Sequence, residues 1–246
     1  MAKKFNHNVG VYNDQSALEI VPILMDKFNP KSVIDIGCGI GNFLKIFSQY
    51  GVNEILGIDG DWVDKELLIQ NIPEEKFKKI DLNTEFKSFV KDYSYKYDLL
   101  ISLEVAEHLA PATAQDFISC LCGLSDNIIF SAAIPFQGGE NHVNEQWPSY
   151  WIELFKSNGF VCNNFMRPLI WNNTNIHWWY RQNMLYFKRN VELIDQPVNA
   201  DISLYNIVHP DLYLANAKWS SDFTIGKFAL GYYFMIFKKI FLRKIK

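Results

Sequence analysis

Short apolar segments alternate with longer helical patterns through the first half of the chain, and this alternation constrains the fold more than any other feature. The apolar segments are candidate β-strands, namely KSVIDIG (31–37), EILGIDG (54–60), FKKIDL (77–82), YDLLISL (97–103) and NIIFSAA (127–133). The helical patterns between them lie at about 41–50, 63–70 and 112–123. Because the strands are continuous apolar runs, we expect a parallel sheet covered on both faces. The pattern predicts a doubly wound α/β domain.

A long polar connection follows the fifth apolar segment. Residues 135–149, PFQGGENHVNEQWPS, are rich in turn-forming residues, and a helical pattern at 150–159 comes after them. Connections this long in a compact domain are usually lids or binding loops. Two further strands are expected at about 160–171 and 180–189, on either side of WNNTNIHWWY. We therefore expect binding residues in both polar segments.

The N-terminal part of the chain predicts a helical cap over residues 1–30. In NDQSALEIVPILMDKF, Ser16 and Glu19 have the spacing of a capping box, and Pro22 is expected to kink or split the helix. Beyond the cap we expect the sheet domain at 31–190 and a C-terminal appendage at 191–246.

Composition and charge narrow the class of protein. With 246 residues and 49% hydrophobic side chains, the chain suits one large domain with embellishments. A formal net charge of −3 argues against a dedicated nucleic-acid binder, so no nucleic-acid partner is expected. The cysteines fit neither a zinc ribbon nor a disulfide framework; they are Cys38, Cys120, Cys122 and Cys162. Since the N-terminal residues do not resemble a signal peptide, we expect a reduced, cytoplasmic protein.

The C-terminal segment differs from the rest of the chain in charge. Residues 227–246 hold six Lys or Arg and no acid, while residues 1–226 carry 18 basic and 27 acidic side chains. The apolar run from Phe228 to Phe237 is too short to span a bilayer. A basic amphipathic helix can lie at an anionic membrane surface, and peripheral membrane contact is one interpretation. The other is a terminal helix that packs on its own domain or on a second subunit.

A glycine-rich turn follows the first strand in VIDIGCGIGNF. Gly37, Gly39 and Gly41 allow the backbone to approach a ligand closely where a helix begins. Asp59 ends the next strand, where an acid can bind a ribose diol. The dinucleotide fingerprint would need a glycine at position 42, which is Asn42. The turn alone is equally explained as a tight connection between strand and helix.

Taken together, these segments resemble the class I S-adenosylmethionine-dependent methyltransferases. The resemblance is carried by Asp35–Gly41, Asp59, Asp81–Leu82 and the strand that ends in SLE (102–104), and it covers about residues 30–190. It implies a Rossmann-like seven-stranded sheet whose last two strands form an antiparallel edge hairpin. It also implies S-adenosylmethionine as cofactor. The residues that it places at the cofactor are Asp35, Gly37, Cys38, Gly39, Gly41, Asp59, Gly60, Trp62, Asp81, Leu82, Leu103 and Glu104.

The stretch ISLEVAEHL places several ligand-type side chains beside the expected cofactor. If the chain becomes helical at Glu104, then Glu107 and His108 share its face through i+3 and i+4 spacing. His142, in ENHVNEQW, is a fourth candidate from the long connection. The pattern E-x-x-E-H with a later His resembles the metal site of small-RNA 2′-O-methyltransferases, and E-x-x-E-H also occurs in ubiquinone-pathway O-methyltransferases. Both resemblances stop at these residues.

Three interpretations of this group remain open. In the first, Mg²⁺ or Mn²⁺ bound by Glu104, Glu107, His108 and His142 acidifies and positions an acceptor hydroxyl. In the second, His108 or His142 is a metal-free general base that Glu107 orients. In the third, Glu104 contacts the cofactor while Glu107 and His108 only cap a helix. Because an alcohol has a high pKa, a metal or base at this point favours O-methylation.

Aromatic and amide side chains in the two polar segments suggest the acceptor. Aromatic faces mixed with amides suit sugar rings, while an arginine suits a phosphate or a carboxylate. The candidates for the acceptor site are Trp147, Trp179, Tyr180, Arg181 and Asn183. For about half of the tryptophans here, a position in the core of the edge hairpin is the better explanation. The two segments resemble bacterial methyltransferases associated with surface-polysaccharide and glycan modification, including capsule synthesis.

The sequence therefore predicts an O-methyltransferase that acts on a sugar, a glycan or a related small metabolite, at a hydroxyl or a phosphate-type oxygen. An RNA 2′-O-methyltransferase is an alternative, and the acidic net charge disfavours it. A non-catalytic S-adenosylmethionine-binding module is a third possibility, which the intact set of acidic residues disfavours. The oligomeric state is not predicted.

Overall fold

The computed structural model describes residues 13–190 and 201–244, and side chains only as far as residue 238. Contacts divide the chain into two units, one ending at residue 207 and the other beginning at residue 208. Residues 1–12 of the expected N-terminal cap and residues 191–200 of the expected appendage lie outside the described part. Within it, no helix is long and apolar enough to cross a membrane.

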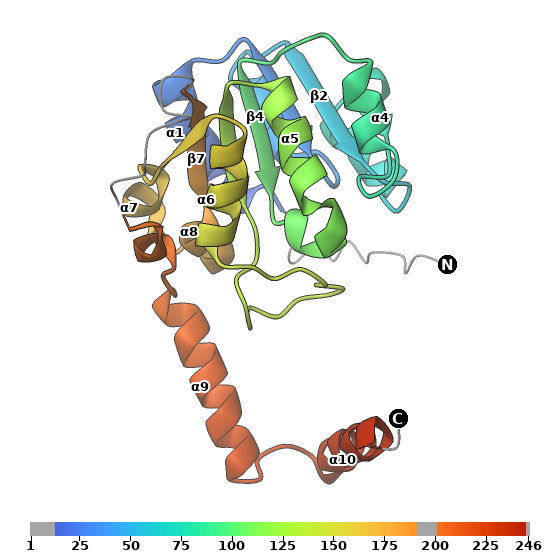
Figure 1. Ribbon diagram of the computed structural model, residues 1–246, viewed down its shortest axis with the longest axis vertical. Helices are drawn as coiled ribbons and strands as arrows, with labels where there is room; N and C mark the ends of the chain where they lie inside the picture. The colour runs from blue at the N-terminus through green and yellow to red at the C-terminus, as the bar shows by residue number, and fades with distance from the viewer. Residues whose placement is uncertain (1–12, 191–200, 245–246) are drawn as a thin grey trace. The chain divides into compact units, whose positions relative to one another are not determined.

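The first unit is built on a seven-stranded sheet, as the sequence predicts (Figure 1). Its strands, in chain order, are β1 (Ser32–Ile36), β2 (Glu54–Asp59), β3 (Phe77–Lys79), β4 (Leu99–Leu103), β5 (Asn127–Ser131), β6 (Phe160–Asn163) and β7 (Leu185–Arg189). They are arranged in the order β3-β2-β1-β4-β5-β7-β6. Neighbouring strands are parallel from β3 to β5, and β7 is antiparallel to both β5 and β6. The expected antiparallel edge is thereby confirmed.

Helices cover both faces of the sheet. Those of the first unit are α1 (Gln15–Phe28), α2 (Asn42–Gln49), α3 (Lys65–Asn71), α4 (Phe86–Lys91), α5 (Ala114–Leu124), α6 (Pro148–Ser157), α7 (Met166–Ile170) and α8 (Trp178–Asn183). Ile34 of β1 belongs to an apolar cluster with side chains of α4, α5 and α6, whereas its neighbour Val33 belongs to a second cluster with α1, α2 and α3. Successive side chains of a strand point to opposite faces. Both faces therefore need apolar residues, which explains the continuous apolar runs in the sequence.

The segment between β6 and β7 differs from the prediction. The expected strands at 160–171 and 180–189 are shorter, because the chain forms α7 after β6 and α8 before β7. The side chain of Asn163 accepts a hydrogen bond from the backbone N–H of Phe165, which turns the chain out of the sheet. Aromatic residues of this segment favour strands by propensity, but their contacts in the folded domain decide otherwise.

The N-terminal helix also departs from the prediction. Helix α1 continues through Pro22 without a break. Ser16 and Glu19 form no capping box. Instead, Ser16 Oγ accepts the backbone N–H of His177, and Glu19 accepts the side-chain amides of Asn173 and Asn175. These bonds fix the segment before α8 against α1, so that the two polar side chains serve the tertiary structure.

The second unit holds two helices, α9 (Pro210–Thr224) and α10 (Leu230–Lys244). A short 3-10 helix, Ile202–Tyr205, precedes them and belongs to the first unit. The helical C-terminal region that the sequence predicts is thus present.

Candidate functional site

A cavity of about 890 Å³ opens at the carboxyl ends of β1, β2 and β4. The chain leaves β1 for β2 on one side and reaches β4 on the other, so this is the switch point where ligands bind in open α/β sheets. Most of the residues chosen from the sequence line it: Asp35, Gly37, Cys38, Gly39, Asp59, Trp62, Leu82, Leu103, Glu104, Glu107, His108, His142, Trp179 and Tyr180. The fold therefore brings together motifs that are far apart in the chain.

Six predicted site residues do not line the cavity; they are Gly41, Gly60, Asp81, Trp147, Arg181 and Asn183. Gly41 is the N-cap of α2, with φ of 80°. Gly60 lies under the ring of Trp62, whose atoms would come within 2.2 Å of a Cβ at that position. The Asp81 carboxylate accepts the backbone N–H of Asn83.

The turn after β1 requires glycine at its first position. Gly37 has φ of 82°, and a Cβ there would lie 2.2 Å from the side chain of Val105. Its backbone N–H donates to the carbonyl of Ile58 at 2.7 Å, which ties the turn to β2. The absence of a side chain leaves backbone as the cavity wall at this point, as close approach to a ligand requires.

Asp59 organises the same turn from the end of β2. One carboxylate oxygen accepts the N–H of Gly39 at 2.8 Å and the other accepts the N–H of Gly60 at 2.7 Å. Burial raises the pKa of this carboxyl, and the two backbone donors oppose the rise. Asp35 lies beside it, and burial together with the charge of Asp59 raises its pKa well above the ordinary range. This end of the cavity is therefore acidic and suits amino or hydroxyl groups.

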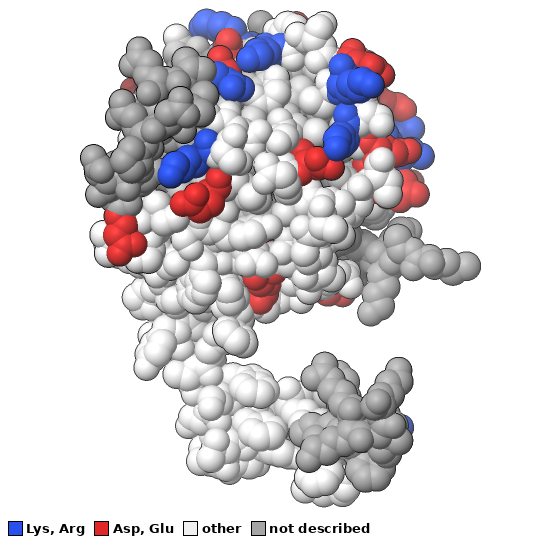
Figure 2. Space-filling model, viewed as in Figure 1, with Lys and Arg blue, Asp and Glu red and all other residues white. Residues whose placement is uncertain are grey.

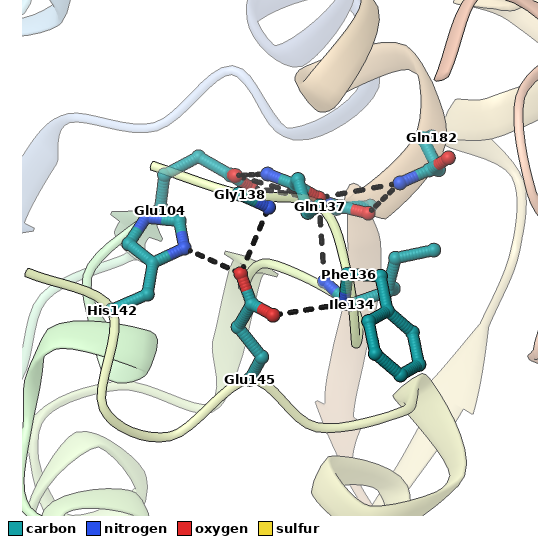
Figure 3. Close-up of polar contacts among 9 residues, drawn as sticks. Glu104, Ile134, Phe136, Gln137, Gly138, His142, Glu145 and Gln182 are labelled. Atoms are coloured by element: carbon teal, nitrogen blue, oxygen red, sulfur yellow. Dashed lines mark hydrogen bonds and ion pairs between the residues drawn. The ribbon is translucent and has the colours of Figure 1, made fainter. Parts of the chain in front are cut away.

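Glu104 adopts a strained backbone conformation immediately after β4. Its φ is 56°, a region that non-glycine residues rarely occupy. The carboxylate accepts the side-chain amide of Gln137 at 2.8 Å (Figure 3). It also accepts the side-chain amide of Asn183 at 3.0 Å. Burial raises its pKa, which these donors partly offset. The expected helix starting at Glu104 is wrong, since the helical turn covers only Ala106–His108.

Three of the four expected metal ligands come together. One ligand atom from each of Glu107, His108 and His142 lies within 4.8 Å of the others, and this group does not include Glu104. We call these three residues the cation group. Because Glu104 precedes the helical turn, the i+3 and i+4 spacing does not align it with Glu107 and His108. Of the four candidate metal ligands, Glu104 therefore lies outside this group.

Glu107 is fully buried, and neither of its carboxylate oxygens has a hydrogen-bond partner of normal geometry. Burial raises the pKa of this carboxyl well above its usual range, and the negative charge of Glu104 adds to the rise. The backbone N–H groups of Glu107 and Ala133 lower this pKa, but their effect is smaller than that of burial. A buried carboxyl group in this state gains much from a bound cation.

The two histidines of the cation group are held by other parts of the loop. Burial and the neighbouring His142 lower the pKa of His108 to about 4, although backbone carbonyls of Glu140 and Asn141 oppose the shift. The Nδ1 of His142 lies 2.9 Å from Glu145 Oε1. Since a carboxylate only accepts, Nδ1 carries the proton in this contact and Nε2 is left as an acceptor.

Glu145 fixes the shape of the loop as well as the ring of His142. Its carboxylate also accepts the backbone N–H groups of Phe136 and Gly138, at 2.9 and 3.0 Å (Figure 3). The carbonyl of Glu107 accepts the N–H groups of Val143 and Asn144, which ties the loop to the helical turn. These contacts explain how His142, 34 residues after His108, reaches the same point.

The expected acceptor residues divide into two groups. Trp179 and Tyr180 line the cavity, together with Trp178 and His177, whose ring stacks on Trp179 at 4.4 Å between centroids. Arg181 is corrected to an interior residue, since it is buried and donates to the carbonyl of Trp171.

Trp147 and Asn183 also change position or role. Trp147 is the N-cap of α6 and is 37% exposed, outside the cavity. Asn183 acts through Glu104, as described above. The sequence did not point to Gln137 or Glu145, and His177, in the expected acceptor segment, was not among the chosen site residues although it lines the cavity. The spacing H-x-x-E was an available signal for Glu145, whereas nothing in the sequence singles out Gln137.

Comparisons with known proteins agree with this architecture. Residues 5–125 match the family model of a methyltransferase domain. The ribosomal protein L11 methyltransferase of Ruminiclostridium cellulolyticum is 27% identical over 100 residues, which cover 39% of this chain and 32% of that protein. Its counterpart from Thermosipho melanesiensis is 28% identical over 80 residues, 32% of this chain and 30% of that protein. The match thus spans about a third of these curated relatives.

Similar solved structures cover more of the chain. Magnesium protoporphyrin IX methyltransferase from Synechocystis, solved with bound SAH, has a TM-score of 0.53 at 20% identity and covers 77% of this chain and 90% of its own. The methyltransferase domain of bacterial CtHen1 has a TM-score of 0.51 at 19% identity, covering 71% and 98%. DesVI of Streptomyces venezuelae has a TM-score of 0.52 at 9% identity, covering 74% and 94%. At these identities the likeness shows the fold.

The family match, the strand order and the glycine turn define the class. The chain contains a class I S-adenosylmethionine-dependent methyltransferase domain.

Proposed function

We propose that this protein is an S-adenosylmethionine-dependent O-methyltransferase that methylates a hydroxyl of a sugar, a glycan or a related small metabolite with the help of a divalent cation. One observation carries the proposal. The glycine turn with Asp59 and the cation group lie in the wall of one cavity, at the switch point of the sheet. A methyl donor and a cation-bound hydroxyl can therefore meet within it.

The residues at the glycine turn fit S-adenosylmethionine. Because Gly37 has no Cβ, the backbone at this position can approach a ligand closely. The buried carboxyl groups of Asp35 and Asp59 suit the amino group and the ribose hydroxyls of such a ligand. When bound, this cofactor supplies a methyl group already activated by its sulfonium. The protein's part is to orient the cofactor and exclude water, which the buried walls Leu82 and Leu103 serve.

The cation group fits a divalent ion such as Mg²⁺ or Mn²⁺. Glu107 offers a buried carboxylate without a hydrogen-bond partner of normal geometry, and His108 is neutral at pH 7. His142 is oriented by Glu145, the arrangement usual for a metal-binding histidine. A bound cation would lower the pKa of an acceptor hydroxyl and position its oxygen. Three protein ligands leave coordination positions open for that oxygen.

The alternative of a metal-free base at His108 is less favourable. A general base works best when its pKa lies near the working pH. Burial and His142 lower the pKa of His108 to about 4, so the ring is neutral but weakly basic. Glu107, with its raised pKa, holds its proton more tightly than an ordinary carboxyl and is a poor partner for a histidine base. A bound cation would activate the acceptor hydroxyl without a strongly basic His108, and it would favour the deprotonated form of Glu107.

The lining of the cavity favours an uncharged, hydroxylated acceptor. No Lys or Arg of the described residues lines it, whereas five acidic residues do: Asp35, Asp59, Glu104, Glu107 and Glu140. A phosphate or carboxylate would find no guanidinium there, because Arg181 is turned into the interior. The stacked rings of His177 and Trp179, with Tyr180 nearby, offer aromatic faces for the C–H faces of a sugar.

Calorimetric titration of Mn²⁺ and Mg²⁺ into protein saturated with S-adenosylhomocysteine tests the cation. We expect saturable binding that disappears in His108→Ala and in His142→Ala. His177→Ala is the matched control, since this histidine also lines the cavity but is outside the cation group, and it should retain binding. No binding to the wild type, or equal loss in the control, contradicts the metal assignment.

A screen for S-adenosylhomocysteine release tests the acceptor. We expect release with one or more hydroxylated sugars or glycans, dependent on Mn²⁺ or Mg²⁺ and reduced in Trp179→Ala. RNA is the second candidate acceptor, because the same cation group would serve a ribose hydroxyl. Release with RNA oligonucleotides alone would favour it over the sugar. Tight cofactor binding without release for any acceptor in the panel would contradict the proposed O-methylation of these substrates.

A further inference from the structure

Helix α10 presents an exposed apolar face. Leu230, Phe234 and Phe237 are 74%, 69% and 76% exposed. Their i, i+4 and i+7 spacing places them on one side of the helix. Single exposed apolar residues are ordinary on protein surfaces, but large aromatic side chains aligned along one helix face mark an interaction site.

Helix α10 packs against the end of α9 and against the connection between the two helices. Rings from the two helices and their connection form one aromatic cluster, composed of Trp219, Phe223, Phe228, Tyr232 and Tyr233. The hydroxyl of Tyr233 donates to the backbone carbonyl of Phe223 at 2.9 Å, which fastens α10 to α9. Tyr232 and Tyr233 are partly buried, whereas Phe234 next to them is exposed. These contacts therefore partly cover one side of α10, while the other side is exposed.

The charge of this segment is opposite to that of the rest of the chain. Residues 227–246 contain six basic residues and no acid, although the whole chain has a net charge of −3. Lys227 is paired with Asp222, and Lys238 follows the apolar face and is exposed. Figure 2 shows surface over the described part of α9 and α10 that is almost without charged side chains on the face in view. In the sequence, five of the six basic residues follow Phe237, at positions 238, 239, 243, 244 and 246.

We propose that helix α10 lies on an anionic lipid surface, with Leu230, Phe234 and Phe237 inserted at the headgroup boundary and the basic residues at anionic headgroups. Aromatic and aliphatic side chains on one face beside a lysine-rich end are the signature of an interfacial helix. Helix α10 has 15 residues, about 22 Å of helix, and does not span a bilayer. Charge complementarity selects lipid over a second copy, because lysine is depleted from protein interfaces. The inference is independent of the proposed function.

Vesicle co-sedimentation of the full chain tests this inference. The two compositions are phosphatidylcholine alone and phosphatidylcholine with 30 mol% phosphatidylglycerol, a choice of probe for zwitterionic and anionic surfaces. We expect partitioning to the anionic vesicles at least about tenfold stronger than to the neutral ones, and a decrease when NaCl is raised from about 50 to 500 mM, since salt screens the headgroup charge. Equal partitioning to both compositions, or to neither, would overturn the proposal.

Two sets of variants separate the apolar and the electrostatic parts. Phe234→Glu with Phe237→Glu should lower partitioning by at least about tenfold. Ile69→Glu with Leu169→Glu is the matched control, because these side chains are similarly exposed at 52% and 60% but lie in the first unit. Neutralising the basic end with the variant K238Q/K239Q/R243Q/K244Q should abolish the preference for anionic vesicles. Equal loss in the control pair would overturn the assignment to α10.

The same variants decide between lipid and a second copy. S-adenosylhomocysteine affinity and far-ultraviolet circular dichroism should match those of the wild type, which shows that the domain remains folded. Sedimentation velocity without lipid should give the same mass for the wild type and the Phe234/Phe237 variant. If the wild type is instead a dimer that this variant dissociates, the face is an interface between copies and the lipid proposal fails.

Discussion

Asp59 and Glu107 are both buried carboxyl groups in the wall of one cavity, yet their surroundings differ in kind. Both oxygens of Asp59 accept backbone N–H groups, so the residue holds the glycine turn in place. Neither oxygen of Glu107 has a hydrogen-bond partner of normal geometry, and burial raises its pKa well above the usual range. The Asp59 carboxyl is therefore held by the backbone before any ligand binds, while the Glu107 carboxyl lacks such support.

The difference extends to the regions around the two residues. The cofactor end is built from residues close to the ends of β1 and β2. Its positive backbone φ falls on a glycine, Gly37, which adopts it without strain. The cation end depends on a strained non-glycine residue, Glu104, and on a loop that returns His142 to the helical turn. Strain and unpartnered polar groups at the second end are a cost that a bound ligand offsets. The predictions below test this contrast.

The largest expected effect is on cation binding. Glu107→Gln keeps the shape of the side chain but removes the negative charge, so Mn²⁺ affinity should fall by at least about a hundredfold, beyond the loss typical of an outer-shell change. Asp59→Asn should leave Mn²⁺ affinity within about twofold. Calorimetry on both variants, saturated with S-adenosylhomocysteine, checks this. An equal loss of Mn²⁺ affinity in the two variants would show that Glu107 and Asp59 do not differ in cation binding.

The second effect concerns the rigidity of the glycine turn. Gly37→Ala should lower the free energy of unfolding by about 3 kcal/mol, because it combines a positive φ with a Cβ at 2.2 Å from Val105. Gly51→Ala is a control with the same strain and no clash, since Gly51 has φ of 88° and nothing within 4 Å. It should cost about 1 kcal/mol. Urea unfolding measures both.

A second-site change sharpens this test. Val105→Ala removes the methyl groups that a Cβ at position 37 would meet, so the double variant should recover part of the stability that Gly37→Ala loses. Additive losses in the double variant would mean that strain in φ, and not the contact with Val105, determines the need for glycine.

The fold and the cofactor end were predictable because their signals are local. A strand such as 31–37 is a continuous apolar run, and the glycine turn follows it directly. Every residue of β1 is buried, and a strand covered on both faces needs such an apolar run, so the pattern indicates the covered sheet directly. The two motifs of the cofactor end, at Gly37 and Asp59, lie at strand ends that the parallel order brings together.

The cation end was predictable only in part because its contacts are long-range. The local spacing correctly joined Glu107 and His108, but it assumed a helix from Glu104 that the positive φ of this residue prevents. Gln137 bonds Glu104 across 33 residues, and no periodicity signals such a pair. The predicted bounds of the strands around α7 and α8 were wrong for the same reason, because long-range contacts such as that of His177 with Ser16 override local propensity.

The third prediction concerns stability in the absence of a cation. In EDTA, Asp59→Asn should lower the free energy of unfolding by about 1.5 kcal/mol, because its amide cannot accept both backbone N–H groups. Glu107→Gln should leave it unchanged or raise it, since no normal hydrogen bond is lost and no buried charge remains. Urea unfolding of the two isosteric variants gives the sign of each effect. A loss in both would show that Glu107 also serves the scaffold.

The pH dependence of this effect follows from the raised pKa of Glu107. The folded protein keeps a proton that the unfolded chain releases at the ordinary carboxyl pKa. The stability from this group is therefore present at low pH and is lost as pH rises toward the folded-state pKa. Glutamine does not titrate, so the advantage of Glu107→Gln over the wild type should grow from pH 5 to pH 8. A difference independent of pH would contradict the raised pKa.

The smallest expected effect is on the orientation of His142. Glu145→Gln replaces the carboxylate that accepts from His142 Nδ1 and from two backbone N–H groups of the loop. Loss of such an outer-shell carboxylate typically lowers metal affinity by about tenfold. We expect this loss for Mn²⁺, with S-adenosylhomocysteine affinity within about twofold of the wild type. Calorimetry with each ligand measures the two affinities.

Glu140→Gln is the matched control for this last variant, because Glu140 lies in the same loop and lines the cavity but is not part of the cation group. It also removes one negative charge, so a purely electrostatic effect would weaken Mn²⁺ binding equally in both variants. A loss confined to Glu145→Gln assigns the effect to the orientation of His142. That result would show that the two carboxyl groups also differ in what holds their surroundings in place. Backbone N–H groups hold Asp59, whereas Glu145, 38 residues after Glu107 in the sequence, orients the histidine beside Glu107.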